Sequence, residues 1–227
     1  MMPPVVKNLL ILNVLAFAAQ LVFRMRTGTM DTGIGPVEQW FALWPAGIPS
    51  ETVLPTFGGL FWPWQIVTSA FLHGDFSHIL FNMFGLWMFG APLEQTLGSK
   101  RFAILFGGAV LGASLLQLGV ISWPFLGDAL PAGAYGPTLG ASGGVLGVLG
   151  AFGMLYPNQP IYLLFLPVPI AAKWMVVGYA AMDILGGFGA YASNTAHFAH
   201  LGGLITGVLL ILYWRGRLPV KPRARTL

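Results

Sequence analysis

Gly140-Ala141-Ser142-Gly143-Gly144 opens the short, apolar and glycine-rich segment 145–156, and the rest of the chain must build a fold around this segment. A serine in the first turn of a membrane helix lies beside backbone N–H groups that the helix leaves without partners. Those groups can stabilise an oxyanion if the serine acts as a nucleophile. The alternative is that Ser142 only caps the helix, a role in which serine is common. Gly-x-Ser-Gly is too short a motif to decide, so other segments must supply a catalytic partner.

The composition is that of a membrane protein. The chain of 227 residues is 56% hydrophobic and 8% charged, whereas a soluble domain carries about 25% charged residues. We therefore expect an all-α polytopic protein in the lipid bilayer, with residues 1–227 forming a single membrane domain. Cysteine is absent, which excludes disulfides and thiolate chemistry. The cations lie at the ends of apolar segments and form no basic face, so a nucleic-acid partner is not expected.

Continuous apolar runs predict a bundle of six membrane spans. The predicted spans are 6–23, 77–95, 102–121, 142–156, 171–187 and 196–214. A long ordered first loop over 27–75, rich in Pro, Gly and Trp, is expected at the membrane interface. Residues 161–170 are apolar but interrupted by two prolines, and we expect an interfacial loop there. The first apolar run could also be a signal peptide, because Ala16-Phe17-Ala18 resembles a cleavage site.

The charges orient these spans. An even number of spans places both termini on one side, and assigning that side as cytoplasmic puts nine of the eleven Lys and Arg residues inside. The nine are Lys7, Lys100, Arg101, Lys173, Arg215, Arg217, Lys221, Arg223 and Arg225. This bias follows the positive-inside rule. We therefore expect residues 215–227 to form a basic cytoplasmic tail, and the protein to lie in the cell (inner) membrane.

The predicted topology brings polar side chains from three spans to one depth. His78 and Asn82 begin span 77–95, Ser142 begins the fourth span, and His200 lies near the start of the sixth. A serine needs a base to become a nucleophile, and His200 can provide it in a dyad that requires no third acid. His78 and Asn82 share one helix face and can both donate to an oxyanion. The spacing thus fills the roles of nucleophile, base and oxyanion donors.

Glycines are placed where spans four and six must approach. Gly143 and Gly147 in one span, and Gly203 and Gly207 in the other, form small-xxx-small patterns that allow close helix contact. We expect Gly140, Gly143, Gly203 and Gly207 to pack helices at the site, which would bring Ser142 to His200. Generic packing is the alternative, since glycine is common in membrane helices.

The remaining polar residues permit other interpretations. His197-x-x-His200 together with His78 could hold zinc, but no His-Glu-x-x-His occurs, and we expect neither metal nor cofactor. His73 is expected to be an exposed loop residue, and His197 a capping or interfacial one. Asp183 has no evident acidic partner for an aspartyl dyad. A transporter is disfavoured because no internal repeat with matched broken spans is visible.

Three motifs in this order resemble those of rhomboid intramembrane serine proteases. They are His78-Ile79-Leu80-Phe81-Asn82, Gly140-Ala141-Ser142-Gly143, and Ala199-His200-Leu201-Gly202-Gly203 with Gly207. The resemblance covers about residues 62–214 and implies that Ser142 is the nucleophile, His200 its base, and His78 and Asn82 the oxyanion-stabilising pair. It also implies a serine endopeptidase that cleaves transmembrane segments of other membrane proteins without a cofactor.

Two positions depart from the family pattern. Trp64-Gln65 stands where the family commonly has Trp-Arg, which puts an arginine-anchored first loop in doubt. Leu146 stands where some members have a tyrosine that stacks on the base, so His200 would lack that ring.

Residues 186–195 are expected to act as a mobile lid over the site. A catalytically silent binder or chaperone of the same fold is the non-enzyme alternative, and a metal-dependent membrane protein a weaker one.

Overall fold

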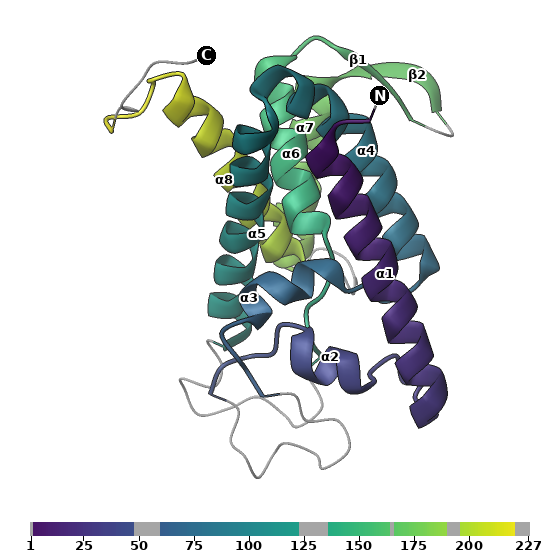
Figure 1. Cartoon of the computed structure of the whole chain (residues 1–227). Helices are drawn as coiled ribbons and strands as arrows, with labels where there is room; N and C mark the ends of the chain where they lie inside the picture. Colours follow the sequence, from purple (N-terminus) through teal and green to yellow (C-terminus); the bar gives the residue numbers. More distant parts are fainter. Residues whose placement is uncertain (1, 48–59, 123–135, 164–165, 190–195, 221–227) are drawn as a thin grey trace.

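The computed structural model describes residues 2–47, 60–122, 136–163, 166–189 and 196–220. Helices dominate this part of the chain and run roughly side by side (Figure 1). The longer ones are α1 (Pro4–Thr27), α4 (Phe76–Leu97), α5 (Ser99–Ser122), α6 (Ser142–Leu155), α7 (Ala172–Gly187) and α8 (His197–Trp214). Short helices α2 (Pro36–Phe41), α3 (Gln65–Thr68) and the 3₁₀ turn η1 (Ser69–Phe71) lie between α1 and α4.

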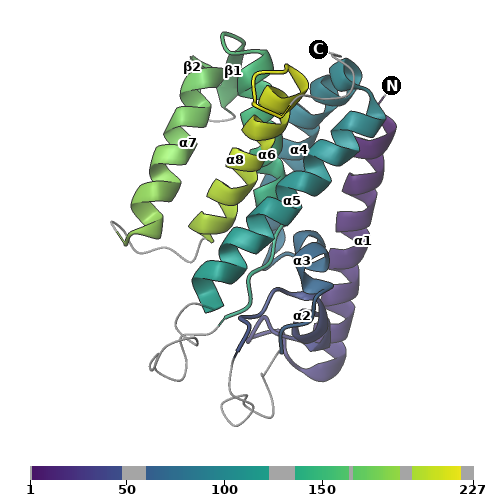
Figure 2. The ribbon, with the colours of Figure 1, turned by 90° about the vertical axis from the view of Figure 1, so that its left-hand side faces the viewer.

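Within the described ranges, four helices are long and apolar enough to cross a membrane: α1, α4, α5 and α8. Helix α6 is apolar but has only 14 residues, which at about 1.5 Å per residue is roughly 21 Å long. Helix α7 has 16 residues. Helix α1 begins and α8 ends at the same end of the bundle, opposite to α2 and α3 (Figures 1 and 2).

Helix α6 is the centre of the bundle. Every residue from Gly143 to Gly153 is buried, and α4, α5, α7 and α8 all contact this helix. A helix that is apolar on all sides is typical of a protein core or of a membrane span, and α6 lies in the core of this bundle. Figure 2 shows α5, α7 and α8 around it. The sequence segment that begins with Ser142 is therefore held by the rest of the fold.

Glycines set the distance between α6 and α8. A Cβ atom placed on Gly203 would lie 1.9 Å from the carbonyl oxygen of Gly143, and one on Gly207 would lie 2.1 Å from that of Gly147. Each contact is between backbones, so no side chain could move aside. Toward α5, a Cβ on Gly202 of α8 would lie 2.5 Å from the carbonyl oxygen of Gly112. Helix α8 thus fits between α5 and α6 only because these positions carry no side chain.

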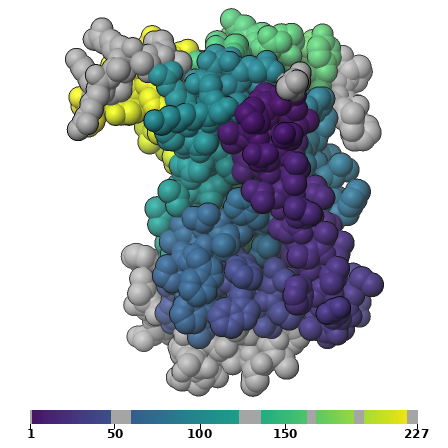
Figure 3. All heavy atoms as spheres, viewed as in Figure 1, coloured from purple at the N-terminus to yellow at the C-terminus, as the bar shows by residue number. Residues whose placement is uncertain are grey.

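A buried polar cluster joins α1 to the segment between α1 and α4. Arg24 Nη2 lies 2.8 Å from Glu38 Oε1, and Gln20 Nε2 donates to the same oxygen at 2.6 Å. Gln20 also binds the backbone of His73, accepting from its N–H and donating to its C=O. Arg24 donates to the carbonyl of Gly74. Because the chain turns into α4 at this point, the cluster fixes where α4 begins. Figure 3 shows α1 along one side of the bundle, above the segment that contains α2 and α3.

His73 is the clearest error among the expected histidine environments. We expected an exposed loop residue, but its side chain is completely buried. Its ring lies edge-on to Phe17 and His78, at centroid distances of 6.5 and 5.0 Å. Burial, and then the nearby His78, lowers the pKa of His73 to about 3. The ring is therefore neutral at physiological pH and packs as an apolar group.

Gln65 anchors the segment between α1 and α4. It stands at the position where the family commonly has an arginine. The side chain is fully buried. Its Oε1 accepts from the backbone N–H of Trp44 at 3.2 Å, and its Nε2 donates to the carbonyls of Trp40 and Leu60 at 3.3 and 2.9 Å. An amide can satisfy both donors and acceptors of a loop backbone, which a guanidinium cannot.

The interfacial loop expected between α6 and α7 is wrong. Residues 161–170 do not form a loop; the strands β1 (Pro160–Leu163) and β2 (Leu166–Ala171) pair there as an antiparallel hairpin. The N–H of Ala172 bonds to the carbonyl of Gln159, and the register of the two strands is irregular between Ile161 and Leu163. The two prolines in β2 have no N–H to donate, which a short two-stranded hairpin tolerates better than the middle of a larger sheet.

Candidate active site

The turn into α6 is held by backbone bonds before Ser142. Leu43 and Thr138 exchange two backbone hydrogen bonds of 2.9 Å, and the N–H of Gly140 donates to the carbonyl of Ser69. Gly140 adopts φ +130°, a backbone region that favours glycine. We expected it to pack helices at the site; it lies just before α6 and not within a helix. A Cβ there would meet Nε2 of His78 at 2.7 Å, so the glycine makes room for that ring.

Ser142 and His200 meet across the α6–α8 contact. Ser142 Oγ lies 2.7 Å from His200 Nε2, although 58 residues separate them in sequence. The hydroxyl and the ring are both partly buried. The glycine contact of Gly143 with Gly203 lies one residue beyond Ser142 and three beyond His200, so it sets this distance directly. A hydroxyl bonded to an imidazole nitrogen is the arrangement of an activated nucleophile.

His78 lies on the other side of Gly140. Its Nδ1 accepts the N–H of Gly74 at 3.3 Å, so the ring proton is on Nε2, which faces Gly140. Ser142 Oγ lies 3.6 Å from the position that a Cβ of Gly140 would occupy, so both side chains border that residue. Asp75 fixes the start of α4 by accepting from the backbone N–H of His78 at 2.9 Å. Hydrogen bonds from Ser77 and from this N–H hold the pKa of Asp75 below its usual value.

Asn82 lies one turn further along α4 and is buried. Its Nδ2 donates to the carbonyl of His78 at 3.0 Å. An amide nitrogen carries two hydrogens, so this bond leaves one for another acceptor. The structure therefore keeps His78 and Asn82 on one face, as expected from their spacing, and places the His78 ring beside Gly140.

Sequence reasoning missed a carboxylate. Asp183 of α7 accepts from two histidines at one oxygen: Oδ1 lies 2.9 Å from His197 Nδ1 and 3.0 Å from His200 Nδ1. His197 was expected at the interface but is buried, with 8% of its surface exposed. The signal that could have found Asp183 is its position as an ionisable residue inside an apolar helix, which usually marks a functional contact.

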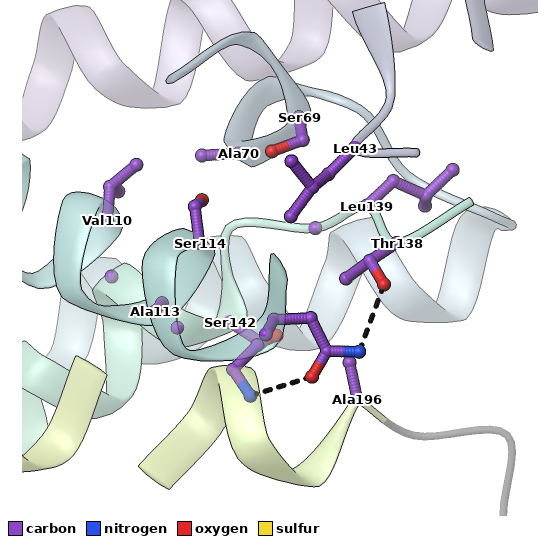
Figure 4. A pocket seen from close by; sticks show the side chains of 15 residues that line it. Leu43, Ser69, Ala70, Val110, Ala113, Ser114, Thr138, Leu139, Ser142 and Ala196 are labelled. Atoms are coloured by element: carbon purple, nitrogen blue, oxygen red, sulfur yellow. Dashed lines mark hydrogen bonds between the residues drawn. The ribbon is translucent and has the colours of Figure 1, made fainter. Parts of the chain in front are cut away.

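A small pocket with a mixed polar and apolar lining adjoins Ser142. It has a volume of about 20 Å³, room for about one water molecule. Figure 4 shows Ser69, Ser114, Thr138 and Ser142 around it. Gln117 of α5 crosses the pocket wall, accepting from the N–H of Ala199 and donating to Thr138. In the described residues no group of three His, Cys, Asp or Glu side chains is arranged to hold a metal ion.

The lid expectation over 186–195 falls mainly on residues 190–195, which lie outside the described residues. The tail cations beyond residue 220 lie outside them too.

Comparison with known proteins places these motifs in one family. The family model described as "Rhomboid domain" matches residues 61–217. "Rhomboid protein 1, mitochondrial" of Saccharomyces cerevisiae is 37% identical over 145 residues, covering 64% of this chain and 40% of its own length. "RHOMBOID-like protein 6, mitochondrial" of Arabidopsis thaliana is 30% identical over 176 residues, covering 71% of this chain and 50% of its own. "Presenilin-associated rhomboid-like protein, mitochondrial" of Mus musculus is 32% identical over 163 residues, covering 68% and 40%.

The chain thus spans half or less of the length of these relatives. The matched region, residues 61–217, contains α4 to α8 and, with them, Ser142, His200, His78, Asn82 and Asp183. Because the family model covers more than half of the chain, the assignment does not depend on the shorter motifs. The chain belongs to the rhomboid family.

Proposed function

We propose that this chain is an intramembrane serine endopeptidase that cleaves transmembrane segments of other membrane proteins. The observation that carries the proposal is the 2.7 Å contact between Ser142 Oγ and His200 Nε2. It occurs at one end of a buried helix, and the adjoining pocket has room for about one water molecule, the second reactant of a hydrolysis.

In this proposal Ser142 is the nucleophile. Its hydroxyl proton moves to His200 Nε2 as Oγ attacks the peptide carbonyl, and a tetrahedral oxyanion forms. His200 then gives the proton to the leaving amine, and an acyl-enzyme remains on Ser142. A water molecule, deprotonated by His200, hydrolyses that ester and returns the serine to its starting state. No metal or cofactor is needed for any of these steps.

Donors for the oxyanion come from α4 and from the first turn of α6. The first intrahelical bond of α6 is donated by Val145, so the N–H groups of residues 142–144 have no partner in the helix. The Nε2–H of His78 and the second hydrogen on Asn82 Nδ2 supply two further donors, as the resemblance implies. Removing one such donor typically lowers kcat by 100- to 1,000-fold.

Serine-specific labelling tests the proposal. Purified protein in detergent is treated with a fluorophosphonate probe and, separately, incubated with a panel of single-span membrane proteins. We expect labelling and cleavage by the wild type, and neither by Ser142→Ala or His200→Ala at an unchanged thermal unfolding temperature. A folded wild type that neither labels nor cleaves would refute the enzyme and favour the silent binder of the same fold.

We also propose six membrane spans, the two shorter ones being α6 and α7, with both termini on the positively charged side. The absence of cysteine makes this measurable. Single cysteines at Thr32 and Lys173, both exposed, should be labelled by membrane-impermeant maleimide from opposite sides. Labelling of both from one side would refute the topology. The relatives named above are mitochondrial, so the expected cell membrane has no support from them.

A further inference from the structure

We infer that Asp183 is a positioning residue for the proposed reaction, because it holds His200 in the tautomer and orientation that a general base needs. His197 in turn holds the carboxylate of Asp183 in place. This inference rests on the proposed function of Ser142 and His200. It replaces the dyad expected from the sequence with a hydrogen-bonded chain that runs from α7 to α8 to α6. The observation behind it is the pair of contacts at Asp183 Oδ1.

The direction of the hydrogen bonds follows from the chemistry of the groups. An ionised carboxylate can only accept, so Nδ1 of His200 must carry a proton when it lies 3.0 Å from Asp183 Oδ1. In a neutral imidazole the other nitrogen then has the lone pair. That nitrogen, Nε2, is the one 2.7 Å from Ser142 Oγ. Asp183 thus selects the only neutral form of His200 that can accept the serine proton.

Helix α7 is oriented to deliver this carboxylate. Asp183 is 7% exposed, whereas its neighbours Ile184 and Leu185 are 45% and 56% exposed. Gly187, one turn later on the same face, would meet the ring of Phe198 at 3.1 Å if it carried a Cβ. The inward face of α7 therefore lies against the start of α8. Figure 2 shows the two helices side by side there.

His197 stabilises the buried carboxylate of Asp183 with a hydrogen bond. A carboxylate removed from water is costly unless hydrogen bonds stabilise it. His197 Nδ1 supplies one at 2.9 Å, from a side chain that is 8% exposed. Its ring lies edge-on to that of His200 at a centroid distance of 6.5 Å. Two donors on one oxygen restrict where the carboxylate can lie, and hence how the His200 ring is turned.

Asp183 also orients the His200 ring, which Leu146 cannot do in place of a tyrosine. The sequence predicted that His200 would have no stacked tyrosine one turn beyond the nucleophile, and Leu146 is packed in the core. A hydrogen bond at Nδ1 fixes both the tautomer of an imidazole and the direction in which its Nδ1 edge points. A stacked aromatic ring restricts only the plane in which the imidazole lies. The carboxylate therefore orients the base without a stacked ring.

The experiment compares Asp183→Asn, Asp183→Glu and the exposed control Asp31→Asn. We expect Asp183→Asn to lower kcat by about 100- to 10,000-fold with little change in KM, because an amide can donate to Nδ1 and select the wrong tautomer. Asp183→Glu keeps the carboxylate and should retain more activity than Asp183→Asn. Asp31→Asn should match the wild type. A kcat for Asp183→Asn within threefold of the wild type would overturn the inference, as would equal losses for Asn and Glu.

A spectroscopic measurement separates this role from a purely structural one. The chain has four histidines, so ¹⁵N-histidine labelling gives an assignable spectrum. We expect His200 in the wild type to show a protonated Nδ1 and an unprotonated Nε2, and Asp183→Asn to reverse or mix the two forms. An unchanged tautomer in a folded Asp183→Asn protein would overturn the inference. This readout does not need activity, whereas a wild type without Ser142-dependent cleavage would refute the proposed function instead.

Discussion

The contact between Gly203 and Gly143 gives the sharpest test of how the fold builds the site. Replacing Gly203 by alanine adds one carbon, 1.9 Å from the Gly143 carbonyl oxygen, where at least 3.0 Å is required. The backbones must therefore separate by about 1.1 Å, the difference between these two distances. Applied to the Ser142–His200 pair, that shift lengthens 2.7 Å to about 3.8 Å, beyond hydrogen-bonding range.

The expected cost is about 100-fold in cleavage rate, the usual effect of a 1 Å displacement at a reacting centre. Overpacking should also destabilise the fold by about 1–3 kcal/mol. The rate is measured as kcat/KM on one transmembrane substrate, at a temperature where wild type and variant are equally folded. The fluorophosphonate labelling rate of Ser142 gives a second measure that does not depend on substrate binding.

The matched control is Gly107→Ala in α5. A Cβ there has no atom within 4 Å, so the variant makes the same chemical change on an open helix surface. It should keep wild-type activity and gain up to about 1 kcal/mol of stability from better helix propensity. If Gly203→Ala cleaves at the wild-type rate while remaining folded, α6 and α8 do not set the distance between Ser142 and His200, and the reasoning fails.

Three further predictions concern α4, His73 and the buried ion pair. Asn82→Ala should slow cleavage about 100- to 1,000-fold while leaving fluorophosphonate labelling of Ser142 detectable; wild-type turnover would remove Asn82 from the oxyanion site. His73 has its pKa lowered to about 3, so between that pH and about 6.5 the unfolded chain binds the extra proton and stability falls as pH falls. His73→Phe should lose less stability than the wild type between pH 7 and 4 in thermal melts, and parallel pH curves would contradict this. Glu38→Gln should cost about 3–5 kcal/mol, because it leaves the charge of Arg24 buried without a counter-ion. Arg24→Met combined with Glu38→Gln should lose less than Glu38→Gln alone in the same unfolding assay, and equal losses would show that the ion pair is not the cause.

Helix positions were largely readable from the sequence, because backbone in a membrane must satisfy its own hydrogen bonds and an apolar run there has to be helical. The predicted span 142–156 became α6 (Ser142–Leu155), and 196–214 became α8 (His197–Trp214). The hairpin over residues 160–171 was not readable in this way. It lies between helices, and the two prolines in its second strand, which lack an N–H for pairing, favoured a loop there.

The sequence by itself also determined that Ser142 begins one helix, that His200 lies near the start of another, and that both helices carry glycines for close packing. This was enough to expect the two side chains to meet. Only the tertiary structure decided which group bonds to Nδ1 of His200 and whether His73 is buried. Asp183 reaches the histidines because one face of α7 turns inward, a rotation that local sequence does not specify. His73 is buried because Gln20, far away in α1, binds its backbone. Contacts across the bundle depend on helix rotation and depth, and these are set by the packing of all the helices together.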